Sequence, residues 1–92
     1  MIGYLTVEFF IYEAQSLKDK RSVVQKAVNR IRQRLNVAVS ETNYQDLWQR
    51  AEISMVTVSS DKIIAEKELQ RALAIITSIT ELEVTHSMIE WL

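Results

Sequence analysis

The sequence predicts a single α+β domain in which two helices cover one face of an antiparallel sheet. Segments with a two-residue period, typical of strands, alternate with segments whose apolar residues recur every three to four positions, as in amphipathic helices. The 92-residue chain is 48% hydrophobic and 25% charged, which is typical of a globular domain. It contains no proline and one glycine, and we find no linker, so residues 1–92 form one domain.

The first predicted element is a strand over residues 2–13, because its apolar residues alternate strictly. One face holds Leu5, Val7, Phe9 and Ile11, and the other holds Tyr4, Thr6, Glu8, Phe10 and Tyr12. A helix follows, since Ser16 and Asp19 have the spacing of a capping box. Its apolar stripe consists of Leu17, Val24, Ala27, Val28, Ile31 and Leu35. A start one turn later, at Ser22, fits equally well, because Lys20 and Arg21 otherwise border this stripe.

The rest of the chain repeats this alternation. A short strand is predicted over residues 36–42, and a second over residues 51–60, with Ile53 and Met55 on one face. Ser59, Ser60 and Asp61 are all favourable caps for a second helix. The stripe of this helix consists of Ala65, Leu69, Ala72, Leu73, Ile76 and Ile79. In the final strand, residues 81–92, alternation places Leu82, Val84, His86 and Met88 opposite Glu83, Thr85, Ile89 and Trp91.

The resulting order, β-α-β-β-α-β, predicts a ferredoxin-like sandwich. Both β-α-β crossovers are expected to be right-handed, which leaves a four-stranded antiparallel sheet with both helices on one face. We expect the core to combine residues of the first strand and both helices: Leu5, Val7, Phe9, Ile31, Leu69, Leu73 and Ile76.

Several classes of function lack support in the composition. There is no cysteine, His86 is the only histidine, and one glycine cannot form a phosphate-binding loop. We therefore expect no catalytic residue, no metal site, no cofactor and no small-molecule substrate. No apolar run approaches the roughly 18–20 residues of a membrane span. We expect a cytoplasmic protein that does not contact a membrane.

The predicted first helix concentrates positive charge. Residues 18–34 hold seven of the eleven Lys and Arg residues, although the net charge of the chain is −1. Cations near the end of a helix are explained by its dipole, whereas Lys18, Lys20 and Arg21 near its start are not. Free N–H groups and mobile cations at a helix start suit phosphate. The candidate nucleic-acid-binding residues are Lys18, Lys20, Arg21, Lys26 and Arg50.

The loop between the middle strands, residues 43–50, is unusual for a connection because it contains a tryptophan. Tyr44, Asp46 and Trp48 form a candidate interaction loop, in which Trp48 stacks on a base or anchors a protein. Trp48 folded back as a lid on the core is the alternative. Arg50 and Trp48 neighbour the helix start only if the loop lies at that end of the sheet.

The uncovered face of the sheet is predicted to be partly aromatic. Tyr4, Phe10 and Tyr12 lie on this face of the first strand, and alternation adds Ile89 and Trp91 from the last strand. Such a face either stacks RNA bases or pairs with a second copy. The third strand lacks the aromatic residues of RNA-recognition domains, so we favour a homodimer.

Two motifs indicate a family. The stretches "SLKDKR" before the first helix and "DLWQRAE" between the middle strands resemble the YlxP-like family of small uncharacterised bacterial proteins, and the similarity extends from "MIGYL" to "EWL". The resemblance implies a ferredoxin-like fold, a bacterial cytoplasmic location and genes among those of translation factors. It implies no catalytic residue. Its family-typical positions are Ser16, Leu17, Lys18, Asp19, Lys20, Arg21, Asp46, Leu47, Trp48, Gln49 and Arg50.

Two functions remain open after the sequence is read. The first is a non-enzymatic accessory protein that binds RNA or the ribosome through the basic first helix. The second is a protein-interaction or self-association module without nucleic-acid contact. The modest overall charge weakens the first, because free nucleic-acid binders are commonly basic overall.

Overall fold

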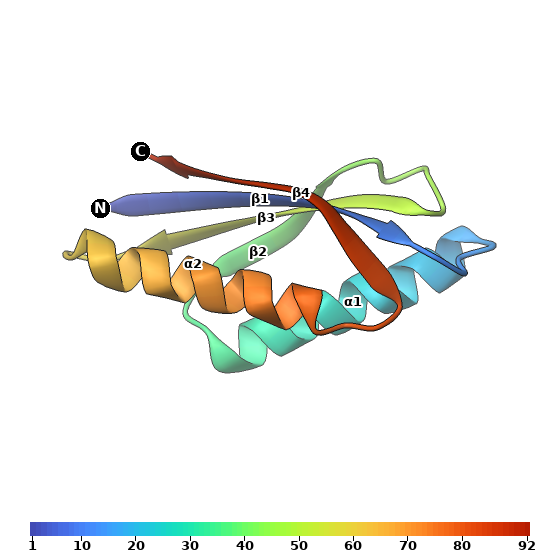
Figure 1. Ribbon diagram of the computed structural model, residues 1–92, viewed down its shortest axis with the longest axis horizontal. Coiled ribbons are helices and arrows are strands. Elements are labelled where there is room, and N and C mark those ends of the chain that lie inside the picture. Colours follow the sequence, from blue (N-terminus) through green and yellow to red (C-terminus); the bar gives the residue numbers. More distant parts are fainter.

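The computed structural model describes all residues 1–92 and shows a sheet with two helices packed beneath it (Figure 1). The elements are β1 (Ile2–Ile11), α1 (Leu17–Arg34), β2 (Ala38–Asn43), β3 (Arg50–Val58), α2 (Lys62–Thr77) and β4 (Leu82–Trp91). The strands are ordered β2-β3-β1-β4 and every neighbouring pair is antiparallel. The predicted ferredoxin-like α+β fold is therefore confirmed.

The core lies between the sheet and the helices. Side chains at alternate positions of β1 and β3 point toward the helices, and those of Val7, Phe9, Ile53 and Met55 are fully buried. The helices contribute Ile31, Leu69 and Ile76, whereas Leu73 packs at the edge of this core. Neither helix is long and apolar enough to cross a membrane.

Each helix begins at a polar cap. The Ser16 hydroxyl accepts a hydrogen bond from the Asp19 N–H at 3.1 Å, and Asp19 in turn accepts one from the Gln15 N–H at 3.1 Å. Asp61 caps α2 in the same way by accepting from Ile63 N–H at 2.8 Å. The alternative start of α1 at Ser22 is wrong, because a full helical turn precedes that residue.

The predicted alternation of β4 is wrong beyond its middle. The β1–β4 register shifts between Glu8 and Phe9, which leaves Thr85 as an extra residue in β4. A bulge of this kind reverses which face the following residues occupy. Trp91 and Ile89 therefore face the helices, where the Trp91 ring approaches Gly3 so closely that a Cβ at position 3 would lie 2.9 Å from it. His86 and Met88 face the open side instead.

Candidate functional site

Lys20, predicted to be a mobile phosphate ligand, is buried in the structure. Only 1% of its side chain is exposed. Its ammonium lies 3.0 Å from the Glu41 carboxylate and donates a hydrogen bond to the Tyr44 carbonyl. The carboxylate is available there because β2 directs Glu41, like Val39, toward the helix side of the sheet. Lys20 is thus a structural partner of an acid and is removed from the accessible cations.

The interaction loop is joined to the start of α1 by this same contact. Both lie at one end of the molecule, at the right in Figure 1. Tyr44 adopts a left-handed backbone conformation with φ of 60°, and the Asn43 side chain accepts from its N–H at 2.9 Å. The loop therefore lies at the end of the sheet where α1 begins, which the sequence had left open, and Lys20 and Tyr44 make the contact.

Arg50, another predicted nucleic-acid ligand, is paired within the molecule. Its guanidinium lies over the Tyr44 ring, 3.9 Å from the centroid, and donates to Glu8 at 3.3 Å. The Tyr44 hydroxyl also donates to Glu8, at 2.9 Å. This hydroxyl and Arg50 hold the pKa of Glu8 below its ordinary value against the opposing effect of burial. The hydrogen bond to Glu8 raises the pKa of Tyr44 in turn.

Trp48 is exposed, so the interpretation of this side chain as a core lid is wrong. Its exposed fraction is 53%, and the neighbouring Leu47 is also exposed. Together with Phe10, these residues line a shallow hollow of about 520 Å³, and Asp46, Gln49 and Arg50 complete its lining. Trp48 is thus available to an external partner.

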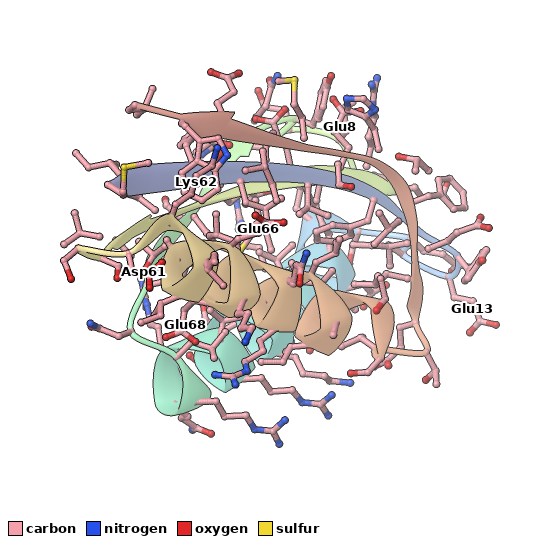
Figure 2. The ribbon with its side chains drawn as sticks, turned by 60° about the vertical axis from the view of Figure 1, so that its left-hand side comes forward. Glu8, Glu13, Asp61, Lys62, Glu66 and Glu68 are labelled. Atoms are coloured by element: carbon pink, nitrogen blue, oxygen red, sulfur yellow. The ribbon has the colours of Figure 1, made fainter.

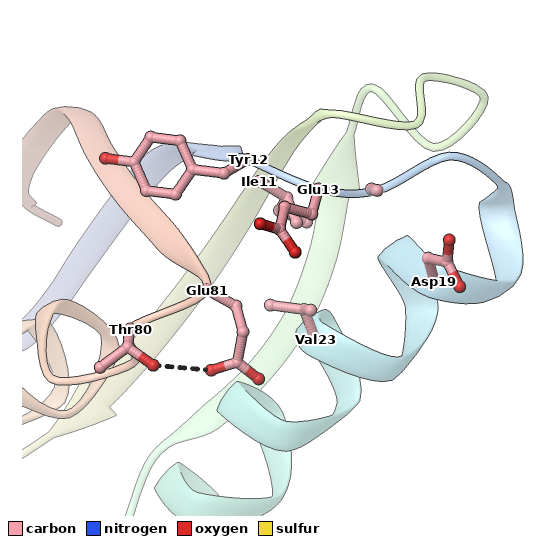
Figure 3. Close-up of a pocket in the computed structure, with 8 residues that line it drawn as sticks. Ile11, Tyr12, Glu13, Asp19, Val23, Thr80 and Glu81 are labelled. Carbon is pink, nitrogen blue, oxygen red and sulfur yellow. Dashed lines mark hydrogen bonds between the residues drawn. The ribbon is translucent and has the colours of Figure 1, made fainter.

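The space beside the helix start is acidic. A cavity of about 290 Å³ opens there between β1, α1 and the turn before β4 (Figure 3). Glu13, Asp19 and Glu81 contribute carboxylates to its lining. Lys26 forms an ion pair with Glu81, which lowers the pKa of this acid. Phosphate is disfavoured here, because the carboxylates repel it and the caps already use helix N–H groups.

Arg21 and Arg32 lie on the other side of α1 and have no acidic partner. They line a groove of about 280 Å³ between α1 and β2, together with Val24, Val28 and Val39. Glu41 also lines this groove, but its carboxylate forms the ion pair with Lys20. One N–H of Arg32 donates to the Val39 carbonyl at 3.2 Å, which holds the guanidinium at the groove. Lys18, which is exposed and unpaired, lies one turn before Arg21. These three cations are free to meet an anion.

The charges divide between the two layers of the fold. Ten of the eleven cations lie on α1 and α2, which carry three acids, so the helix layer has a net charge of +7. The strands and connections carry Arg50 and nine acids, a net charge of −8. Figure 2 shows the two layers and places Glu8 on the side of the sheet away from the helices. Anionic ligands are therefore favoured at the helices and disfavoured at the open sheet face.

The open sheet face is also more polar than predicted. The Tyr4 hydroxyl bonds to Ser54 at 3.1 Å, and Thr42 extends this network at 2.7 Å. Phe10 and Tyr12 remain exposed and form an edge-to-face pair with centroids 5.7 Å apart. The expected aromatic face therefore keeps Tyr4 and the Phe10–Tyr12 pair but loses Ile89 and Trp91, which face the helices.

Sequence reasoning missed Glu41, Glu8 and Arg32 as partners of the site. One signal was present for Lys20, since it lies three, four, seven and eight residues before Val23, Val24, Ala27 and Val28 and thus continues the apolar stripe. Val39 and Glu41 also share the period of a strand, which places an acid on the inward face. A lysine and an acid at inward positions of adjacent elements indicate a buried ion pair.

The fold and these contacts define a small ferredoxin-like domain with a cationic helix layer. The chain belongs to the family described as Protein of unknown function (DUF503), whose model matches residues 2–89. The uncharacterized protein YlxP of Bacillus subtilis is 46% identical over 91 residues, which covers 99% of each chain. The resemblance to the YlxP-like family is thereby confirmed.

Two solved structures share the architecture. A C-terminal segment of the alpha subunit of aIF2 from Pyrococcus abyssi matches with a TM-score of 0.61 at 17% identity, over 92% of this chain and 50% of that one. This chain therefore spans half the length of the archaeal segment. The de novo designed protein Foldit4 matches with a TM-score of 0.54 at 14% identity, over 99% and 98% of the two chains. At these identities the likenesses show the fold alone.

Proposed function

We propose that this protein is a non-enzymatic accessory protein of bacterial translation that binds RNA phosphates through the exposed cations of α1. The observation that carries the proposal is the groove in which Arg21 and Arg32 lack any acidic partner, although the molecule contains one more acid than cations. Two unpaired guanidinium groups suit phosphate, because their planar forks bind its oxygens in pairs.

The geometry of α1 suits an extended anion. Arg21 and Arg32 are eleven residues apart, which corresponds to about 16 Å along a helix axis. This distance spans several phosphates of a duplex, because each strand of double-stranded DNA carries one phosphate for every 3.4 Å or so of its helix axis. Lys18 extends the row by one further turn. The acidic open sheet face argues against base stacking there, so the RNA contact consists of phosphates and the helix layer.

The proposal is tested by cosedimentation with purified bacterial ribosomal subunits. We expect the protein to sediment with a subunit at about 50 mM salt and to dissociate by about 200 mM, because phosphate contacts release counterions. The double variant Arg21→Gln/Arg32→Gln should lose most of the cosedimentation at low salt.

A matched control removes the same charge from the other helix. Lys67 and Arg71 lie exposed on α2, so Lys67→Gln/Arg71→Gln has the same net charge as the groove variant. We expect this control to bind nearly as well as the unmodified protein. If both variants lost cosedimentation equally, the loss would be explained by net charge alone and not by the groove. Unchanged binding in both variants would overturn the proposal.

A second candidate function is protein recognition through the exposed end of the sheet. The hollow lined by Phe10, Leu47 and Trp48 favours it, because exposed tryptophans often anchor protein interfaces. Trp48→Ala distinguishes the two functions. Loss of ribosome cosedimentation in Trp48→Ala, with normal binding by Arg21→Gln/Arg32→Gln, would favour the second candidate.

A further inference from the structure

The two edges of the sheet differ in how their backbone groups are satisfied. On the β2 edge, the Val39 carbonyl accepts from Arg32 at 3.2 Å and the Glu41 carbonyl accepts from Gln45 at 3.3 Å. On the β4 edge, no side chain or backbone group bonds to the outer side of residues 86–90. Natural proteins usually protect long edge strands. Beyond the bulge at Thr85, residues 86–90 of β4 have no such hydrogen bonds along their outer side.

The bulge at Thr85 determines which backbone groups β4 presents. The Leu92 N–H donates to the Ile2 carbonyl at 2.9 Å, so residue 92 directs its backbone groups toward β1. The direction of the backbone groups alternates along an antiparallel strand. The N–H and C=O groups of Met88 therefore also point toward β1, whereas those of Ser87 and Ile89 point away from it. Beyond the bulge, three residues of β4, Ser87, Ile89 and Trp91, therefore offer unpaired N–H and C=O groups to a further strand.

The side chains beside this edge are apolar on both faces of the sheet. Met88 is 46% exposed on the open face, and Ile89 is 36% exposed on the helix face. A further strand paired with β4 would cover both side chains at once. His86 and Glu90 follow on the open face, on either side of Met88.

We propose that β4 pairs antiparallel with β4 of a second copy, around a two-fold axis at Met88. In this register Ser87 bonds to Ile89 of the second copy, and Met88 packs against its own equivalent. His86 lies opposite Glu90 of the second copy, twice by symmetry, so the histidine is set against an acid. A two-fold axis requires this kind of self-complementary edge.

Neighbouring registers are less complementary. An axis at Ile89 places Met88 opposite Glu90, an apolar side chain against a charge. An axis at Ser87 places His86 opposite Met88 and sets the irregular Thr85 opposite Ile89, whereas the axis at Met88 sets Thr85 opposite Trp91, at the end of β4. Of these three registers, only the axis at Met88 sets His86 opposite an acid and pairs residues 86–90 regularly on both sides of the axis.

This arrangement joins the two sheets edge to edge and keeps all four helices on the same side. The two cationic helix layers then form one continuous surface, which doubles the area available to phosphate. It also replaces the dimer expected from Tyr4, Phe10 and Tyr12, since stacking the open faces would bring Glu8, Glu52, Glu83 and Glu90 against their equivalents.

Single cysteines test the register, because the chain has none of its own. Residues opposite each other at a non-hydrogen-bonded position lie about 4.5 Å apart at Cα, which is within the range of a disulfide. Met88→Cys should therefore form a covalent dimer on mild oxidation. Ser87→Cys and Ile89→Cys should stay monomeric when oxidised separately and cross-link when mixed.

Sedimentation of the unmodified protein over a wide concentration range should show a monomer–dimer equilibrium. His86→Glu should shift this equilibrium toward monomer, and the exchanged pair His86→Glu/Glu90→Lys should restore the dimer. Thermal unfolding confirms that each variant is folded. A strict monomer at high concentration, or efficient cross-linking of Ile89→Cys with itself in place of Met88→Cys, would overturn the proposal.

Discussion

The buried and exposed sides of the first turn of α1 show how neighbouring cations serve different purposes. Lys20 and Arg21 are adjacent in one motif, yet Lys20 is buried against Glu41 and Arg21 lines an open groove. The direction of each residue around the helix decides this difference, because Lys20 continues the apolar stripe and Arg21 does not. A cluster of cations in a sequence therefore has to be divided by helix face before it is assigned to a ligand.

The largest loss of stability is expected when the buried ion pair of Lys20 is broken. Lys20→Met removes the ammonium and leaves the Glu41 carboxylate, whose Oε2 has no hydrogen bond, without its ionic partner. Breaking a buried ion pair typically costs about 3–5 kcal/mol, and we expect the lower end because Glu41 retains 19% exposure. Arg21→Met should change stability by less than about 0.5 kcal/mol. Chemical denaturation of both variants measures the contrast, and equal values would contradict it.

A double variant separates the charge from the packing. Replacing both partners of a buried pair by apolar residues is often neutral or stabilising. Lys20→Met/Glu41→Leu should therefore recover most of the stability lost in Lys20→Met. A double variant as unstable as the single one would assign the loss to the contact between Lys20 and the Tyr44 carbonyl.

A smaller loss of stability is expected when the Ser16 cap of α1 is removed. Ser16→Ala removes the hydrogen bond to the Asp19 N–H and should cost about 1 kcal/mol in the free energy of unfolding. Ser22→Ala is the matched control inside the helix and should cost much less. If Ser22→Ala proved the more costly, α1 would begin one turn later than observed.

Arg50 has an acidic partner, as Lys20 does and Arg21 does not. We expect the ionisation of this partner, Glu8, to make the stability depend on pH. The pKa of Glu8 is lowered in the folded state, mainly by Tyr44 and then by Arg50, so its ionised form stabilises the fold. This contribution is present above 4.5, the ordinary pKa, and is lost as the pH falls through the lower folded value.

Glu8→Gln tests this sign. The stability difference between the unmodified protein and Glu8→Gln should be largest near neutral pH and shrink as the pH falls well below 4.5. Asp46→Asn removes an exposed acid of the nearby loop that forms no ion pair, and it is the control for the change in net charge. A difference that grows on acidification would contradict the assigned pairing of Glu8.

The order of elements and most of the core could be predicted from the sequence, because period and capping are local properties. The faces of Leu5, Val7, Phe9, Ile53 and Met55 follow directly from strand alternation. The bulge at Thr85 could not be predicted, since no proline or glycine marks it and it depends on the pairing with β1. One extra residue therefore reversed the faces of Ile89 and Trp91.

The candidate site was only partly predictable for a related reason. The density of positive charge identified α1 as a candidate binding surface. It could not separate the free cations from those in ion pairs, because the paired acids are distant in the sequence. Lys20 reaches Glu41, Lys26 reaches Glu81 and Arg50 reaches Glu8, over 21 to 55 residues. These partners are brought together by the crossover connections of the fold.

The salt dependence of RNA binding by Lys18→Gln/Arg21→Gln tests the exposed side of the turn most directly. These two cations have no ion pair, so the variant should unfold at nearly the same temperature as the unmodified protein. The slope of log affinity against log salt should become shallower by about 0.7–0.9 for each lost phosphate contact. The charge-matched Lys67→Gln/Arg71→Gln should retain the full slope. An unchanged slope in Lys18→Gln/Arg21→Gln, with RNA still bound, would contradict the assignment of α1 as the phosphate-binding surface.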